Sequence, residues 1–185
     1  MDIKFCIQCG NSTHLTIPEM DTHHRHQCQT CGFIHYQNPN IIAGCLVYHR
    51  EKVLLCKRAI EPRYGLWTVP AGFMENGEST RAAAIRETRE EANAMVELKD
   101  LFFIANLVPI NQVYMLYLAE LVNEDFYAGI ESLDVQLFSE QQIPWENLAF
   151  KTVEITLKKF FQARQNNQFE LHEIEFKADR SVIWF

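Results

Sequence analysis

The chain has 185 residues, of which 48% are hydrophobic and 22% are charged, and its formal net charge is −7. This size suits one well-packed core with a small appendage, and the acidic balance argues against general nucleic-acid binding. No apolar run reaches the ~18 residues needed to span a bilayer, and the opening residues lack the apolar segment of a secretory signal. We therefore expect a cytoplasmic protein that binds neither a membrane nor nucleic acid.

Four cysteines form the first feature in chain order. Cys6 and Cys9 are two residues apart, eighteen residues follow, and Cys28 and Cys31 repeat the two-residue spacing. This pattern is typical of a structural zinc site, and the glycine after each pair suits the turn that aims two thiolates at one ion. Since four protein ligands leave no position for water, we expect Zn²⁺ to be structural. A disulfide pair, four unrelated thiols, or three cysteines with a nearby histidine are the alternatives.

Hydrophobic periodicity predicts the elements that follow. A turn-rich junction at 36–40 ends the cysteine segment. Strands are predicted over 41–48, 53–57, 101–108, 113–121, 135–138 and 169–176, and helices over about 79–93 and 151–165. The predicted domains are a zinc ribbon over 1–36, a main domain over 37–150, and a C-terminal helix and strand extension over 151–185.

Three carboxylates dominate the first predicted helix. Glu87, Glu90 and Glu91 follow a glycine-marked loop at spacings of three and four, so they share one helix face. A like-charge pair four residues apart costs an ordinary surface helix roughly 0.2–0.5 kcal/mol. A bound divalent cation would turn that repulsion into attraction. The alternative is a solvated acidic face with Arg86 and Arg89 as partners.

The stretch that contains these carboxylates resembles the Nudix box, GX5EX7REUXEEXGU, in which U is a bulky aliphatic residue. Asn93 replaces the second box glycine, and Thr88 and Ala94 replace the two aliphatic residues. Because asparagine tolerates a left-handed backbone, we still expect the helix to end at Asn93. Six of the seven fixed letters match: Gly72, Glu78, Arg86, Glu87, Glu90 and Glu91.

The resemblance extends to a zinc-ribbon subgroup of Nudix hydrolases, through CGFIHYQNP at the junction and EPRYGLWTVPAGFMENGE before the helix. It implies an α/β fold, an α/β/α sandwich around a mixed sheet preceded by a small N-terminal zinc ribbon. It also implies a metal-dependent pyrophosphatase that cleaves a nucleoside diphosphate linked to another moiety, releasing AMP and a phosphorylated product. Relatives of this kind often form homodimers, so a homodimer is expected.

FAD and ADP-ribose are the favoured substrates under this resemblance. Related NADH pyrophosphatases carry SQPWPFPxS shortly after the box, and this chain has LFFIANLVPINQVYMLYLAEL there. Pro109 lies fifteen residues after Ala94, close to where ADP-ribose hydrolases often have a proline. The alternatives are an NADH or other dinucleotide pyrophosphatase, a nucleic-acid- or protein-binding module, and a non-catalytic nucleotide-sensing regulator. A regulator would be expected to lack a box glutamate.

The resemblance also implies roles for residues of the box. Glu87 and Glu91 would bind Mg²⁺ or Mn²⁺, Glu90 would act as ligand or base, and the carbonyl of Ala71 would complete the shell. Arg86 would orient Glu87 by a charge-assisted hydrogen bond. The part played by Glu78, behind the ligands or paired with Arg86, is less determined by the pattern.

Some Nudix enzymes take the general base from a later loop. Glu131 is our first candidate and Glu124 the second, although an exposed loop carboxylate or a helix cap is the alternative for Glu131. Arg58 and Arg63 could grip phosphate oxygens in a fork geometry. Several aromatic residues could stack on adenine or isoalloxazine, or pack in the core instead: Tyr64, Trp67, Phe73, Tyr114 and Trp145.

Overall fold

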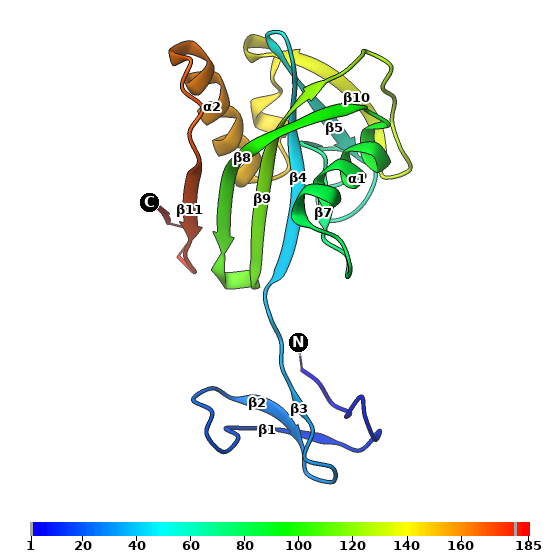
Figure 1. The fold of residues 1–185 in the computed structure, drawn as a ribbon, viewed down its shortest axis with the longest axis vertical. Coiled ribbons are helices and arrows are strands. Elements are labelled where there is room, and N and C mark those ends of the chain that lie inside the picture. Colours follow the sequence, from blue (N-terminus) through cyan, green and yellow to red (C-terminus); the bar gives the residue numbers. More distant parts are fainter. Residues whose placement is uncertain (1, 180) are drawn as a thin grey trace. The chain divides into compact units, whose positions relative to one another are not determined.

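The computed structural model describes residues 2–179 and 181–185. The chain divides into two compact units, Met1–Asn38 and Pro39–Phe185 (Figure 1). The first unit is a three-stranded antiparallel sheet in the order β1 (Thr13–Thr16), β2 (Arg25–Cys28) and β3 (Ile34–His35). The predicted three-part division at residues 36 and 150 stays a prediction. In the described residues, every helix is too short or too polar to cross a membrane.

A mixed sheet organises the second unit. Its strand order is β10-β5-β4-β9-β8-β11-β12, with β6 paired to β5 and β7 paired to β4. Two of its pairings are parallel, β4 with β9 and β8 with β11, and the others are antiparallel. The strands are β4 (Asn40–His49), β5 (Lys52–Arg58), β6 (Trp67–Thr68), β7 (Ala71–Phe73), β8 (Val96–Leu107), β9 (Gln112–Leu121), β10 (Ser132–Ser139), β11 (His172–Phe176) and β12 (Val182–Trp184).

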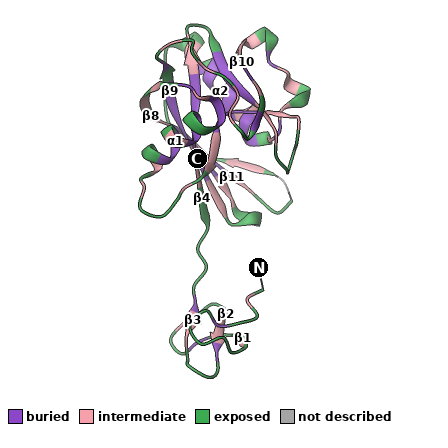
Figure 2. Cartoon of the chain, turned by 90° about the vertical axis from the view of Figure 1, so that its right-hand side faces the viewer, coloured by how far each residue is buried: buried purple, intermediate pink, exposed green. Residues whose placement is uncertain are grey.

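Two helices cover opposite faces of this sheet, and alternation along each strand supplies both cores. In β4, Cys45 and Val47 join the cluster beneath α1 (Thr80–Ala92), whereas Leu46 joins the cluster beneath α2 (Lys151–Asn166). Figure 2 shows these buried strands. The α/β/α sandwich with a mixed sheet is therefore confirmed.

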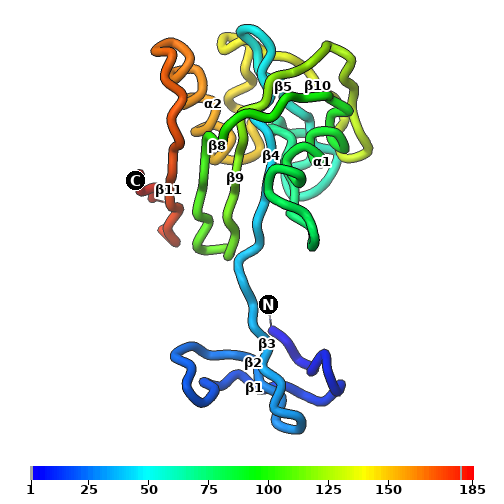
Figure 3. Tube along the Cα trace, viewed as in Figure 1, coloured from blue at the N-terminus to red at the C-terminus, as the bar shows by residue number. Residues whose placement is uncertain are grey.

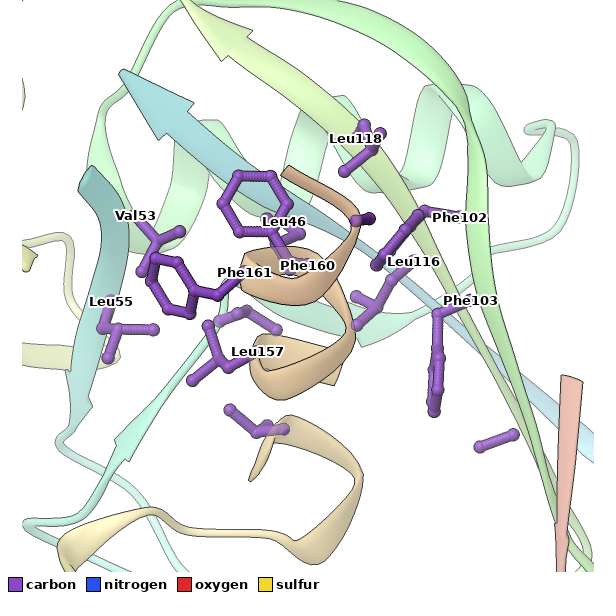
Figure 4. Packing of buried hydrophobic residues seen from close by; sticks show 14 of the residues in the cluster. Leu46, Val53, Leu55, Phe102, Phe103, Leu116, Leu118, Leu157, Phe160 and Phe161 are labelled. Atoms are coloured by element: carbon purple, nitrogen blue, oxygen red, sulfur yellow. The ribbon is translucent and has the colours of Figure 1, made fainter. Parts of the chain in front are cut away.

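The two helices pack by different means. Helix α1 buries only small or polar side chains, three alanines, Thr88 and two glutamates, whereas α2 inserts large side chains, among them Leu157 and Phe160 (Figure 4). Truncating a buried phenylalanine such as Phe160 to alanine typically costs about 3–5 kcal/mol. Phe150 occupies the N-cap position of α2 without a side-chain capping bond. Three short 3-10 helices complete the unit: Val108–Ile110, Glu140–Gln142 and Trp145–Asn147.

The observed elements are longer than predicted at several ends. Strand β8 begins at Val96, not at 101, because its charged first residues pair in the sheet with β9 while Lys99 lies against Glu97 and Glu120. The tail strand is instead shorter than predicted, because it begins at His172 and not at 169; it runs parallel to β8, far away in the sequence (Figure 3). The short strands β6, β7 and β12 carry too few residues for a periodic signal.

Candidate functional site

The four cysteines of the first unit form one cluster. Their Sγ atoms all lie within 4.8 Å of one another, and Cys6–Cys31 and Cys9–Cys28 are separated by 3.7 and 3.5 Å. All four are free thiols, which excludes the disulfide alternative. A tetrahedral zinc ion with Zn–S distances of about 2.3 Å needs thiolates at about this separation. The residues therefore fit a metal ion, and the cluster includes no histidine.

Each pair of cysteines is presented by the same kind of turn. The amide of Gly10 donates to the carbonyl of Cys6 at 2.9 Å, and Gly32 does the same to Cys28. Both glycines have positive φ, 74° and 76°, a backbone conformation that L side chains rarely adopt. The glycine after each pair is thus required by the turn that aims the two thiols inward.

The carboxylates of the box lie on α1 next to β7. Ser79 caps the helix by accepting from the amide of Ala82 at 3.2 Å, and the helix ends at Asn93 in the left-handed conformation, as predicted. Gly72 faces the carboxyl group of Glu87, where a Cβ atom would come within 2.4 Å. The box glycine therefore makes room for Glu87 between helix and strand.

Glu87 and Glu91 are buried carboxylates. They are 9% and 6% exposed. Burial raises the pKa of Glu91 to about 8, an effect opposed by the amide of Ala71, which donates to its Oε1 at 3.3 Å. Burial also raises the pKa of Glu87, and Arg86 opposes this rise. Two partly desolvated carboxylates of this kind favour a proton or a cation between them.

Arg86 joins the other carboxylates. Its guanidinium forms a fork with Glu78, with Nε to Oε2 at 3.1 Å and Nη2 to Oε1 at 2.6 Å. The Nη1 atom donates to Glu87 at 2.7 Å and to Glu90 at 2.9 Å, and Nη2 also reaches the carbonyl of Phe73 at 3.1 Å. This pairing lowers the pKa of Glu78. Arg86 thus fixes the β7–α1 loop and orients Glu87.

The glutamate side chains do not form a compact group of ligands like that of the four cysteines. In the described residues, the four cysteines alone form a group of at least three ligating side chains within 4.8 Å. Glu90 is 59% exposed in its side chain and turns toward Arg86. The carboxylate donors nevertheless fit a hard divalent cation, because oxygen ligands of this type are the ones that such cations take.

A cavity of about 1660 Å³ opens over these carboxylates. It exceeds the ~300–1,000 Å³ of an ordinary small-molecule pocket. Its lining includes most of the predicted site residues: Arg58, Ala71, Phe73, Arg86, Glu87, Glu90, Glu91 and Glu131. Its apolar wall comes from β4, the end of β8 and the 3-10 helix after it, β9 and the N-cap of α2: Ile42, Leu107, Ile110, Tyr114 and Phe150.

Arg58 is held rigidly on this lining. Its Nε donates to the carbonyl of Pro62 at 2.9 Å, and its guanidinium carbon lies 5.3 Å from the ring centroid of Phe150. The stacking leaves the terminal nitrogens to face a ligand. Phe150, which sequence reasoning missed, has no local signal because it meets Arg58 only in the folded chain.

The predicted substrate residues divide into two groups. Arg58 and Phe73 line the cavity, whereas Arg63 and Trp67 are not among its lining residues. Trp67 packs against Phe138 with ring centroids 4.9 Å apart, which matches the core-packing alternative. Substrate roles for Arg63 and Trp67 stay predictions.

The two candidate bases lie in different places. Glu131 lines the cavity, and its charge helps to raise the pKa of both Glu87 and Glu91. Glu124 instead lies 3.4 Å from Nε2 of His49 and is not a lining residue. The position of Glu131 follows from long-range contacts of its backbone, which the sequence pattern does not reveal.

Two family models match the chain. Residues 38–162 match the NUDIX domain, and residues 4–37 match the zinc-ribbon model described as Nudix N-terminal. A solved NUDIX hydrolase from Nitrosomonas europaea is 51% identical, with a TM-score of 0.89 over 94% of this chain and 99% of that one.

Curated relatives are more distant. The NAD-capped RNA hydrolase NudC of Vibrio vulnificus is 28% identical over 77% of this chain, which spans only 53% of that protein's length. An ADP-ribose pyrophosphatase of Methanocaldococcus jannaschii is 24% identical over 62% of this chain and 69% of its own. With its box helix, its ribbon and the NUDIX match over most of its length, the chain belongs to the Nudix hydrolase family.

Proposed function

We propose that the protein is a divalent-cation-dependent pyrophosphatase acting on a nucleoside diphosphate linked to another moiety, with FAD and ADP-ribose as the favoured substrates. The observation that carries this proposal is the pair of buried carboxylates, Glu87 and Glu91, on the lining of a large cavity with Arg86 beside them. A purely structural surface helix has no reason to bury two acidic groups four residues apart with a single arginine beside them.

Mg²⁺ or Mn²⁺ is the proposed cation. When bound, such an ion would neutralise phosphate charge and make a water molecule more acidic. Glu87 and Glu91 would hold it, with Glu90 and the carbonyl of Ala71 as further ligands. Because Glu91 has a pKa of about 8, it holds a proton near neutral pH that the cation would displace.

The remaining residues orient the reactants. Glu131 would accept a proton from a water molecule whose oxygen attacks phosphorus. The bridging P–O bond then breaks, and AMP and the phosphorylated partner leave. Arg86 keeps Glu87 in place through its 2.7 Å bond, and Arg58 would bind a phosphate oxygen with its free nitrogens.

The apolar wall suits the ring of the substrate. Ile42, Leu107 and Tyr114 form a surface on which a planar ring can lie, and Phe73 is 55% exposed beside them in the cavity lining. A cavity of this size accommodates two linked nucleotide-sized moieties better than one mononucleotide. We therefore favour substrates with a group on each side of the pyrophosphate.

A second candidate is an NAD-linked substrate. The similarity to NudC proteins, named as NAD-capped RNA hydrolases, supports it. RNA with a nucleotide cap is therefore one of the substrates to be tested. The negative net charge of the chain argues against general RNA binding. The segment after the box, LFFIANLVPINQVYMLYLAEL, lacks the motif of NADH pyrophosphatases and leaves FAD and ADP-ribose as our first choice.

A substrate panel tests the proposal. FAD, ADP-ribose, NADH, an NAD-capped oligoribonucleotide and dNTPs would each be incubated with and without Mg²⁺ or Mn²⁺, and products separated by chromatography. We expect release of AMP from FAD or ADP-ribose only with the cation. Glu91→Gln should reduce kcat by about 100-fold or more, since ligand changes exceed the 10–100-fold typical of outer-shell changes. Glu97→Gln, a change at an exposed carboxylate of β8, is the matched control.

Each result selects a function. Turnover of NADH or the capped RNA alone would move the assignment to the second candidate. Tight binding of one nucleotide without turnover would indicate the nucleotide-sensing regulator. We further propose Zn²⁺ as the ion of the cysteine cluster and a homodimer as the assembly, to be measured by metal analysis and sedimentation. The cytoplasmic location stays a prediction.

A further inference from the structure

The segment between β9 and β10, residues 122–131, runs along the C-terminal end of α1, and we call it the base-bearing segment. The amide of Tyr127 donates to the carbonyl of Ala92 at 3.0 Å, and the amide of Gly129 donates to the carbonyl of Glu91 at 2.9 Å. These carbonyls belong to the last turn of the helix, which has no partners of its own for them. The segment therefore caps the helix that carries the carboxylates.

Gly129 makes this approach possible. A Cβ atom at position 129 would lie 1.7 Å from the carbonyl oxygen of Glu90, a backbone atom that cannot move aside. The segment is thus in direct backbone contact with the turn that carries Glu90 and Glu91. A small shift of the segment would therefore move Glu90 and Glu91, and a shift of these residues would move the segment.

A third bond comes from the residue that departs from the Nudix box. Asn93, with φ of 50°, occupies the left-handed position that glycine fills in the family pattern. Its Nδ2 donates to the carbonyl of Tyr127 at 3.2 Å. A glycine would accept this backbone conformation at lower cost but would have no amide to donate. The departure thus adds a bond between helix and segment.

The far end of the segment is fixed as well. Glu131 receives a hydrogen bond at its carbonyl from the amide of Ala59 at 2.8 Å, and the amide of Ser132 donates to the carbonyl of Gly129 at 3.1 Å. Glu131 therefore lies two residues beyond the Gly129 contact, between two anchored points. Its side chain is exposed on the cavity lining, so these backbone bonds are what determine its place.

We propose that Asn93 is a positioning residue. Its side-chain amide holds the base-bearing segment against α1 and so keeps Glu131 at a set position relative to Glu87 and Glu91. The catalytic part of this inference rests on the function proposed above, whereas the mechanical part, that Asn93 fixes the segment, does not. The two parts need separate measurements.

Asn93→Gly in the full chain is the test variant, because it restores the family residue, keeps the left-handed backbone accessible and removes the side-chain bond. Asn167→Gly is the matched control, since Asn167 has the same left-handed conformation at the end of α2, with φ of 52°, and does not line the cavity. Residue-resolved amide exchange would be followed by NMR. A net hydrogen-bond contribution of about 1 kcal/mol predicts exchange at Tyr127 and Gly129 about 5-fold faster in Asn93→Gly and unchanged in Asn167→Gly.

Kinetics then test the link to Glu131. With the best substrate of the panel, Asn93→Gly should lower kcat by roughly 3- to 10-fold and leave the cation affinity unchanged, in line with a single lost bond. In a Glu131→Gln background the same change should have no further effect, because the group being positioned is gone.

The outcomes separate the inference from the proposed function. Unchanged exchange at Tyr127 and Gly129 would overturn the inference, as would an equal kcat loss in the Glu131→Gln background or a Glu131→Gln variant with full activity. Absence of turnover on the whole panel would refute the proposed function instead. In that case the exchange rates still decide whether Asn93 fixes the segment.

Discussion

The cysteine cluster and the carboxylate cluster are candidate metal sites of opposite construction. The thiols are already gathered, with pairs at 3.5 and 3.7 Å, whereas Glu87 and Glu90 are drawn to Arg86 and form no compact group. In residues 2–38, the buried residues are Cys6, Pro18, Cys28 and His35, so this unit has almost no core without its thiols. The carboxylates instead lie on a helix with a core of its own. We therefore expect a metal ion to support folding in the first unit and chemistry in the second.

Breaking the cysteine cluster should have the largest effect. Cys28→Ser should unfold the first unit, because zinc binding contributes about 10–16 kcal/mol of apparent folding free energy in comparable small motifs. Limited proteolysis and zinc analysis would show cleavage within 2–38 and loss of bound zinc, with 39–185 still resistant. A variant that kept its zinc and its protease resistance would contradict the contrast drawn here.

The carboxylate cluster should make the free energy of unfolding depend on pH. In protein without added divalent cation, Glu91 has a pKa of about 8 when folded against an ordinary value of 4.5. Below about 4.5 the group is protonated in both states, and its contribution to stability is fully present. Between about 4.5 and 8 only the folded state keeps the proton, so the free energy of unfolding falls as pH rises, and by the time pH has passed 8 the loss is on the order of a few kcal/mol.

Thermal unfolding at pH 5 and pH 8.5 measures this effect. Glu91→Gln removes the titrating group and should reduce the difference in thermal stability between pH 5 and pH 8.5. In the unsubstituted protein, Mg²⁺ or Mn²⁺ should restore stability at pH 8.5. An identical pH slope in Glu91→Gln would show that other groups cause it.

A smaller effect is expected from the arginine fork. Arg86→Lys keeps the positive charge but cannot form the paired bonds to Glu78 or reach Glu87 and Glu90 together. We expect turnover and Mn²⁺ affinity to fall by roughly 10–100-fold, as for residues that orient metal ligands. Titration with Mn²⁺ and steady-state kinetics are the measurements. Native-like values for both would mean that charge alone suffices.

The smallest effect is expected at Thr88, where the box pattern has an aliphatic residue. Thr88 is fully buried, and its hydroxyl donates to the carbonyl of Ala84 at 2.8 Å. Thr88→Val exchanges that bond for apolar packing, so the free energy of unfolding should change by about 1 kcal/mol or less. Urea unfolding would measure it, and a loss of several kcal/mol would mean that the hydroxyl is essential to the helix.

Local spacing made much of the site predictable. The knuckles, the start of α1 near Ser79 and its end at Asn93 depend on residues within one turn of each other, and these predictions were confirmed. The strand predicted over 41–48 is likewise observed as part of β4.

Contacts between segments far apart in the chain could not be predicted from local spacing. The parallel pairing of β11 with β8 and the stacking of Arg58 on Phe150 each join segments far apart in the chain. The sequence ranked Glu131 before Glu124 as the candidate base, but only the folded chain shows that Glu131 lines the cavity and that Glu124 lies beside His49.

The N-cap residue of α2, Phe150, forgoes helix stability in favour of a contact in the cavity. A serine or aspartate in place of Phe150 could cap the helix and add about 0.5–2 kcal/mol, whereas Phe150 makes no such bond. Its ring instead supports the guanidinium of Arg58. Laboratory evolution that selects for thermal stability alone would favour a capping residue at position 150. The stabilised protein would then lack the aromatic ring that packs against Arg58 in the cavity.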